Sequence, residues 1–142
     1  MIILDTNVIS AFMRERQELE VVRWLNSQPR SSVWTTSITV FESHSGLLSM
    51  PSGRRRDALT LAFELLLNEK IQGRIVAFDL AAAQKASELE AAGLSQGRPR
   101  DPRDTMIAGI VLANHATLAT RNVRHFEDIG KWVVNPWESS SG

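Results

Sequence analysis

Three carboxylates stand at points of the chain where acidic side chains can act together. Asp5 directly follows an apolar run, Glu42 follows Phe41 in a stretch of helical spacing, and Asp104 lies in the first turn of another expected helix. Each also has an ordinary interpretation: Asp5 as a helix N-cap, Glu42 as a solvated helical residue, and Asp104 as a partner of its helix cap and dipole. If the three meet, they repel one another, and a cation is the simplest way to keep them ionised.

Clustered carboxylates favour a hard divalent ion bound through oxygen, most simply Mg²⁺ or Mn²⁺. The sequence contains no Cys and three His, which excludes disulfides, thiolate metal sites and Cys nucleophiles and disfavours zinc. A divalent ion suits phosphate esters, because it polarises a phosphoryl oxygen and activates water without a protein nucleophile. The absence of a nucleophile elbow and of a phosphate-binding Gly-rich loop agrees with this chemistry.

Length and composition favour one globular domain. The chain has 142 residues, 43% of them hydrophobic, and we expect a single domain over residues 1–138 followed by a disordered Ser-rich tail over 139–142. The 16 basic and 16 acidic residues balance, which argues against binding to nucleic acid by overall charge alone. No segment approaches the roughly 20 apolar residues that cross a bilayer, and no signal peptide is evident, so a cytoplasmic protein is expected.

Apolar runs that alternate with helical patterns predict an α/β fold with a mainly parallel sheet. Strands are expected over 2–4, 33–35, 75–78, 117–120 and 132–134, and helices over 7–13, 18–28, from Ser37 to about 50, 55–71, 80–92 and from Pro102. The first strand is continuous enough in apolar residues to be a central one. Ser37 is expected to cap its helix and Gly93 to end the helix over 80–92. Ligands of such sheets bind beyond the carboxyl ends of the strands, which is where Asp5 falls.

Four segments, taken in order, resemble a known family. They are Ile2 to Ile9, Thr36 to Glu42, Asp104 to Gly109, and the closing stretch from Leu118 through Trp137. In these segments the chain resembles the PIN-domain ribonucleases, specifically the VapC type of toxin and its FitB-like branch. The resemblance implies a three-layer α/β/α PIN-like fold with a central, mainly parallel sheet.

The resemblance also implies roles for residues. Asp5, Glu42 and Asp104 would be metal ligands, with Asp5 and Asp104 closest to the principal ion. Thr6 would orient Asp5 or contact phosphate, and Asn7 would begin the next helix and support the site. Helix capping is the structural alternative for both Thr6 and Asn7.

The main departure from the family concerns a fourth acid near the Thr-Arg-Asn stretch. The corresponding positions hold Asn122 and His125. Asn122 offers a carbonyl oxygen to a metal or its water without negative charge, so a weaker second metal site is expected. His125 would hydrogen-bond phosphate or assist proton transfer, with packing or surface exposure as the alternative. Glu127 and Asp128 are better explained as solvated charges than as substitutes.

The family implies an RNA-hydrolysing toxin that a cognate VapB-like or FitA-like antitoxin inhibits. A homodimer, and a toxin–antitoxin assembly held on DNA through the antitoxin, are also implied. The antitoxin would fill a groove near the site and place an Arg among the acids. Four arginines would bind RNA phosphates, and the alternative is that they are solvated surface residues: Arg98, Arg100, Arg121 and Arg124.

Two other kinds of function are weighed against the ribonuclease. A catalytically inactive PIN-like interaction subunit would explain the missing fourth acid. A phosphoacceptor receiver domain would use Asp79, but it needs a Lys after a later strand and Lys131 precedes one. A phosphatase with an Asp-x-Asp opening lacks its second acid, because Asn7 occupies that position.

Overall fold

The computed structural model describes residues 1–14 and 16–138, and within them the chain forms one parallel sheet. The strands lie in the order β3-β2-β1-β4-β5, and every neighbouring pair is parallel. Their bounds are β1 Ile2–Leu4, β2 Val33–Thr36, β3 Ile75–Val76, β4 Thr117–Ala119 and β5 Val133–Val134. The first strand is central, as its continuous apolar run predicts. Because all strands point the same way, their carboxyl ends share one edge of the sheet.

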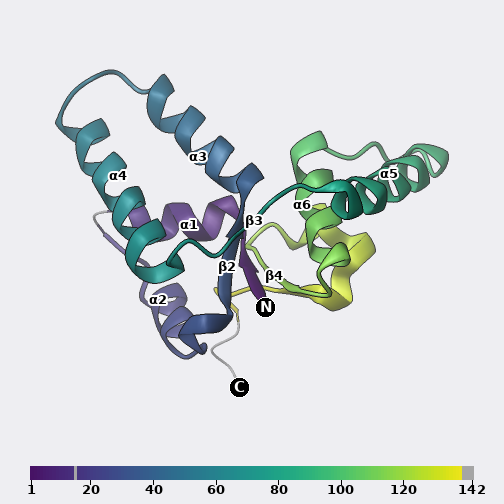
Figure 1. Cartoon of the computed structure of the whole chain (residues 1–142), viewed down its shortest axis with the longest axis horizontal. Helices are drawn as coiled ribbons and strands as arrows, with labels where there is room; N and C mark the ends of the chain where they lie inside the picture. Colours follow the sequence, from purple (N-terminus) through teal and green to yellow (C-terminus); the bar gives the residue numbers. More distant parts are fainter. Residues whose placement is uncertain (15, 139–142) are drawn as a thin grey trace.

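Helices cover both faces of the sheet, as Figure 1 shows. One side carries α1 Thr6–Met13, α2 Leu19–Asn26, α3 Ser37–Ser49 and α4 Arg54–Leu65, which continues as a π-helical turn over Leu66–Ile71. The other side carries α5 Leu80–Ser95, α6 Pro102–Ala113 and the kinked 3₁₀ segment Val123–Trp132. A short 3₁₀ turn, Arg30–Ser32, precedes β2. The three-layer α/β/α arrangement with a parallel sheet is therefore confirmed.

Two apolar cores lie on opposite faces of the sheet because side chains alternate along a strand. Leu4 packs into a core with residues of α1 to α4 such as Val8 and Phe63. Its neighbour Ile3 points the other way, into a core with Ile107 of α6 and Leu118 of β4. The central strand is thus buried on both faces, which fixes the position of the residue that follows it.

Several local expectations are corrected by the structure. Thr36, rather than Ser37, caps α3, since its hydroxyl accepts a hydrogen bond from the backbone N–H of Thr39 at 3.0 Å. The helix over 80–92 does not end at Gly93 but continues to Ser95. A Cβ on Gly93 would lie 2.6 Å from the carbonyl oxygen of Arg98, so this glycine permits a close chain approach instead of ending the helix. The strand expected over 75–78 is limited to Ile75–Val76.

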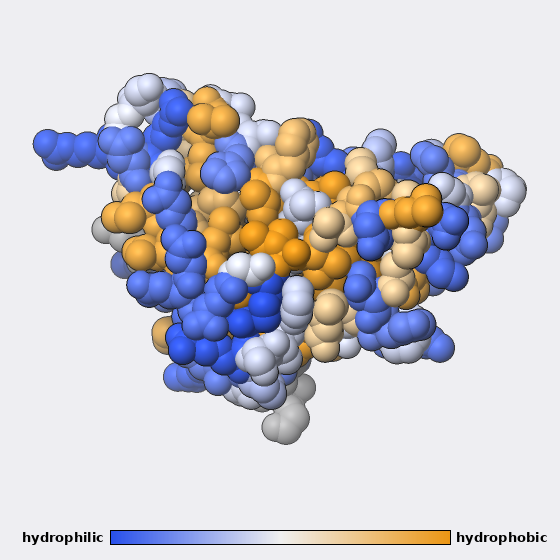
Figure 2. All heavy atoms as spheres, viewed as in Figure 1, coloured by the Kyte–Doolittle hydropathy of each residue, from blue (hydrophilic) through white to orange (hydrophobic). Residues whose placement is uncertain are grey.

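The surface carries apolar side chains on several helices. Figure 2 shows apolar residues gathered between the α3–α4 hairpin and the α5–α6 pair on the face in view. Large exposed apolar side chains include Leu48 of α3, Leu61 and Leu65 of α4, and Leu80 of α5. Among the described residues, no helix combines the length and apolar character that crossing a membrane requires. The expected disordered tail, 139–142, lies outside the described residues, and the single domain over 1–138 stays a prediction.

Candidate active site

Asp5 lies at the carboxyl end of the central strand and is held by three donors. One carboxylate oxygen accepts a hydrogen bond from the backbone N–H of Thr6 at 2.8 Å. The other accepts from the hydroxyl of Thr120 at 2.8 Å and from the amide of Asn7 at 3.2 Å. Asp5 is therefore the N-cap of α1 and a buried carboxylate at once, so its two interpretations do not compete.

Burial is the main cause of a raised pKa at Asp5, and the negative charge of Asp104 adds to it. The hydrogen bonds from Thr120, Thr6 and Asn7 oppose this rise because they stabilise the ionised form. The carboxylate is thus costly to keep charged in this place, and three donors are arranged to offset that cost.

Glu42 is tied to the beginning of α1 although it belongs to α3. The hydroxyl of Thr6 donates a hydrogen bond to one oxygen of Glu42 at 2.9 Å. The guanidinium of Arg103 lies 3.8 Å from the other oxygen. Thr6 therefore touches both acids, Asp5 through its backbone N–H and Glu42 through its hydroxyl.

Asp104 enters the site from the first turn of α6. Asp101 caps this helix, accepting hydrogen bonds from the backbone N–H groups of Arg103 and Asp104, and Pro102 occupies the first turn as expected. The Nδ1 atom of His125 lies 3.0 Å from an oxygen of Asp104. Partial burial raises the pKa of Asp104, the charges of Asp101 and Glu42 raise it further, and His125 opposes the rise.

The structure brings Asp5, Glu42 and Asp104 to the same edge of the sheet, where the charge of Asp104 acts on Asp5 and that of Glu42 acts on Asp104. Oxygen donors of this kind suit a hard divalent cation, whose charge would relieve the repulsion. Over residues 1–14 and 16–138, however, no three His, Asp or Glu side chains are grouped closely enough to hold a metal ion as they stand. Two of the acids are instead engaged by Arg103 and His125.

A cleft of about 590 Å³ opens beside Asp104, between the end of α5, the loop before α6 and the 3₁₀ segment. Arg98, Arg124 and His125 line this cleft. Arg100 also lines it, but its side chain is 9% exposed, donates to the Thr105 hydroxyl at 3.1 Å and pairs with Asp128. Arg100 therefore braces the wall of the cleft, and Asp128 is its ion-pair partner.

The remaining expected residues lie around the end of β4. The backbone N–H of Asn122 donates to the Thr120 hydroxyl at 3.0 Å. The backbone N–H of Arg121 donates to the side-chain oxygen of Asn7 at 2.9 Å, so Asn7 links Asp5 to this segment. The guanidinium of Arg121 lies over the ring of Trp137, 5.0 Å from its centroid.

Sequence reasoning missed two residues of this site, Thr120 and Arg103. Thr120 is fully buried and follows β4 just as Asp5 follows β1, so the rule that singled out Asp5 also applies to it. Arg103 precedes Asp104 in the same first helical turn, and its partner Glu42 is distant in sequence, so only the packing of α3 near α6 reveals it.

The three-layer α/β/α fold, with acids at the carboxyl edge of a parallel sheet, is the arrangement that the sequence resemblance to PIN domains implies. The PIN domain family matches residues 2–131, and this chain belongs to that family. The chain is 37% identical over 139 residues to the plasmid stability protein StbB of Pseudomonas syringae pv. tomato, covering 98% of this chain and 100% of the relative.

Two further relatives match over nearly their whole length. The VapC ribonuclease Y4jK of Sinorhizobium fredii is 34% identical, with 97% of this chain and 99% of the relative covered. The crystal structure of FitAcB from Neisseria gonorrhoeae contains a chain that is 31% identical and superposes with a TM-score of 0.86, covering 97% of this chain and 99% of that chain.

Proposed function

We propose that this protein is a metal-dependent ribonuclease toxin, which hydrolyses RNA phosphodiester bonds and is neutralised by a cognate VapB-like or FitA-like antitoxin. The observation that carries the proposal is that Asp5, Glu42 and Asp104 lie within electrostatic range of one another at the carboxyl edge of the sheet, with Thr6 hydrogen-bonded to both Asp5 and Glu42. Membership of the PIN domain family and a relative named as a ribonuclease support it.

The metal would be Mg²⁺, with Mn²⁺ as a substitute, held by Asp5, Glu42 and Asp104. Bound there, a divalent ion supplies charge that polarises a phosphoryl oxygen and lowers the pKa of water. Thr120 and Asn7 orient the carboxylate of Asp5, and Thr6 orients Glu42. Asn122 brings no negative charge, so a second ion would bind more weakly.

Arginines beside the acids would hold the RNA. Arg98 and Arg124 line the cleft next to Asp104, together with His125, which would bind a phosphate oxygen or move a proton. Arg121 follows β4, and its guanidinium lies over the ring of Trp137. Arg100 is engaged with Asp128, so its contribution to binding RNA would be to shape the cleft.

Partners would be protein chains as well as RNA. The exposed apolar residues of α3 and α4 offer a surface for an antitoxin segment or for a second copy in a homodimer. Assembly on DNA would then occur through the antitoxin. Because the substrate would be cellular RNA, we propose that the protein acts in the cytoplasm.

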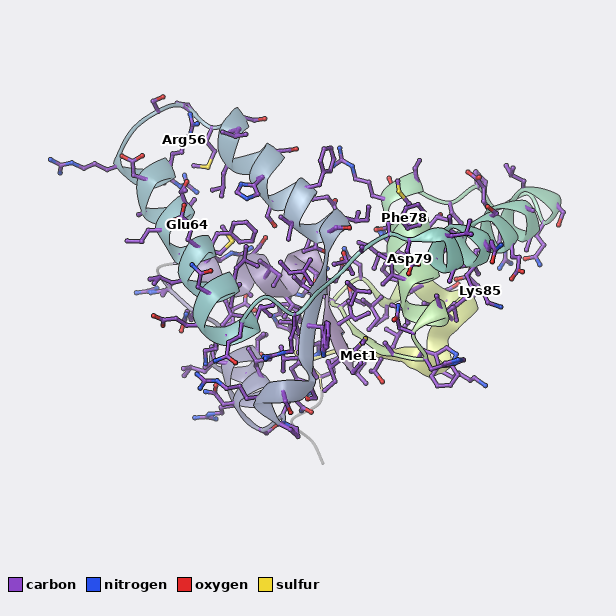
Figure 3. The ribbon with its side chains drawn as sticks, in the orientation of Figure 1. Met1, Arg56, Glu64, Phe78, Asp79 and Lys85 are labelled. Carbon is purple, nitrogen blue, oxygen red and sulfur yellow. The ribbon has the colours of Figure 1, made fainter. Side chains whose placement is uncertain are left out.

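The receiver interpretation is not supported by the site. Asp79, labelled in Figure 3, caps α5 by accepting a hydrogen bond from the backbone N–H of Ala82 at 3.0 Å. The ammonium group of Lys131 lies over the ring of Trp132, 4.8 Å from its centroid. Each of these two residues therefore has a structural role of its own.

Cleavage of RNA is expected to require a divalent cation. The antitoxin-free protein, incubated with total RNA, should cleave it in Mg²⁺ or Mn²⁺, lose activity in excess chelator and regain it when Mg²⁺ is restored. Gel analysis of the products measures all three conditions. Cleavage that persists in chelator would reject a metal-dependent mechanism, and no cleavage in either metal would favour the inactive interaction subunit.

Thr120→Val is expected to lower the rate of RNA cleavage by about 10- to 100-fold, as loss of a residue that orients a metal ligand commonly does. Valine keeps the shape of threonine but removes the donor to Asp5 and the acceptor for Asn122. Thr120→Ser, which keeps the hydroxyl, should retain most of the activity. Equal rates for the Val and Ser variants would show that the hydroxyl does not position Asp5.

A further inference from the structure

An exposed aromatic ring stands next to the acidic site without a role in the fold. Phe41 is 55% exposed although it directly precedes Glu42 on α3. The buried residues of this helix are Thr39, Ser43 and Leu47. Phe41 belongs to neither apolar core. The fold therefore gives no reason for a large apolar side chain at this position.

Arg103 lies against this ring. The centre of its guanidinium is 4.9 Å from the ring centroid of Phe41, and one of its nitrogens is 3.8 Å from an oxygen of Glu42. Its side chain is 48% exposed, so part of the guanidinium remains open to solvent. The guanidinium thus lies over the ring at the rim of the acidic site, and the two side chains come from α6 and α3.

Arg103 and Phe41 supply a positive charge and an aromatic surface, both of which the three acids lack for binding RNA. Asp5, Glu42 and Asp104 repel a polyanion, and the cleft with Arg98 and Arg124 lies between α5 and the 3₁₀ segment. Arg103 and Phe41 come instead from α6 and α3. Positive charge therefore borders the acids from two groups of elements, and the second group adds the exposed phenyl ring of Phe41.

We propose that Phe41 and Arg103 form a stacking subsite for an unpaired nucleotide next to the phosphodiester that is cut. The base would stack on the flat surface of the guanidinium and the ring, and the guanidinium N–H groups would bind its phosphate. Single-stranded RNA is recognised in this way because every base has a stacking face, whereas paired bases are not free to splay out. The subsite rests on the proposed ribonuclease function and predicts a preference for unpaired RNA at the cut.

RNA binding can be measured separately from cleavage in a protein that also carries Asp5→Asn, because this substitution is expected to slow cleavage too far to consume the RNA during the measurement. The probe is a labelled single-stranded RNA that contains a cut site located by product analysis with the active protein. In this background Phe41→Ala should raise the Kd by about 5- to 100-fold, the range of one lost base stack. Phe41→Trp should retain the affinity. Leu48→Ala, on the same helix and 68% exposed, is the matched control and should leave the Kd unchanged.

An RNA with an abasic nucleotide beside the cut shows whether Phe41→Ala weakens binding by losing a base stack or by losing contact surface in general. On the abasic RNA, Phe41→Ala should cause no further loss, because the base that it would contact is already absent. Arg103→Ala should weaken binding to both RNAs and lower the slope of log affinity against log salt by about one. Arg103→Lys should restore the salt slope but not the affinity, since an ammonium does not stack as a guanidinium does.

The subsite is overturned if Phe41→Ala and Leu48→Ala bind the probe with the same Kd, or if the loss at Phe41 is equal on intact and abasic RNA. Unchanged RNA binding together with lost antitoxin binding by Phe41→Ala would assign the ring to a protein interface instead. Failure of the ribonuclease proposal is a different result: the protein with native Asp5 would then cut no RNA at all.

Discussion

Asp5→Asn is expected to reduce RNA cleavage by about a thousandfold or more, because a carboxylate that holds a catalytic cation supplies several kcal/mol at the transition state and each ~1.4 kcal/mol is a factor of ten. The amide is nearly the same shape as the carboxylate, and its oxygen can still accept the hydrogen bond from Thr6 that caps α1. The initial rate of cleavage of a defined RNA in saturating Mg²⁺ measures the effect.

Stability should respond differently from activity. Burial raises the pKa of Asp5, so the ionised group costs folding free energy that an amide does not. The amide also destabilises the fold, because its NH2 group replaces the oxygen that accepts hydrogen bonds from Thr120 and Asn7. The two effects oppose each other, and Tm should change by a few degrees at most. Asp57→Asn, which removes an exposed acid in the first turn of α4, should leave activity unchanged and lower Tm by a few degrees at most, since only its interaction with the helix dipole is lost.

A comparable loss of activity in Asp57→Asn would mean that charge in general, rather than the site, is being measured. If Asp5→Asn cleaved RNA at the native rate, Asp5 would be a helix cap and nothing more.

Gly109→Ala is expected to be strongly destabilising, because Gly109 has the closest neighbours of all the described glycines. A Cβ at Gly109 would lie 2.5 Å from the carbonyl oxygen of Ala82, 2.8 Å from the Cβ of Ala86 and 2.9 Å from its backbone nitrogen. These atoms belong to the backbone and to a short side chain of α5, so they cannot move without shifting the helix. Overpacking of this kind costs typically 1–3 kcal/mol, and we expect about 3 kcal/mol in urea unfolding.

Gly46→Ala is the matched control for Gly109→Ala. Gly46 also lies in a helix, and a Cβ there would meet nothing within 4 Å. Alanine favours helix over glycine by about 1 kcal/mol, so this variant should be slightly more stable than the native chain. The packing of α5 against α6 would be looser than the structure shows if both variants unfolded at the same urea concentration.

The sequence predicts elements well where a local rule governs them. The apolar run before Asp5 identifies a central strand, and the Asp101-Pro102 pair marks the start of α6. Local rules fail where distant contacts decide. Gly93 reads as a helix end, yet it lies inside α5 because the chain near Arg98 returns against it. Helical spacing over residues 18–28 places Leu19 on one side with Val22 and Leu25, yet Leu19 is 66% exposed and Val21 is buried instead.

The site divides in the same way. Asp5, Glu42 and Asp104 can be chosen from the sequence because each is an acid at the start of a helix or beside an apolar stripe. The neighbours that hold them cannot, since Thr120 contacts Asp5 across 115 positions and Arg103 contacts Glu42 across the packing of two helices. Residue type reveals the reacting groups, whereas their orientation depends on long-range packing.

Because the Thr120 hydroxyl orients Asp5, the proposed active site cannot be complete until both residues have been translated. The carboxylate of Asp5 is oriented by a hydroxyl that lies 115 positions further along the chain, and β1 pairs with β4, which is translated long after it. A nascent chain on the ribosome that has not yet released residues 117–120 lacks both the neighbouring strand and the donor. The proposed hydrolytic site would therefore form only after residues 117–120 have left the ribosome, long after Asp5 itself has been translated.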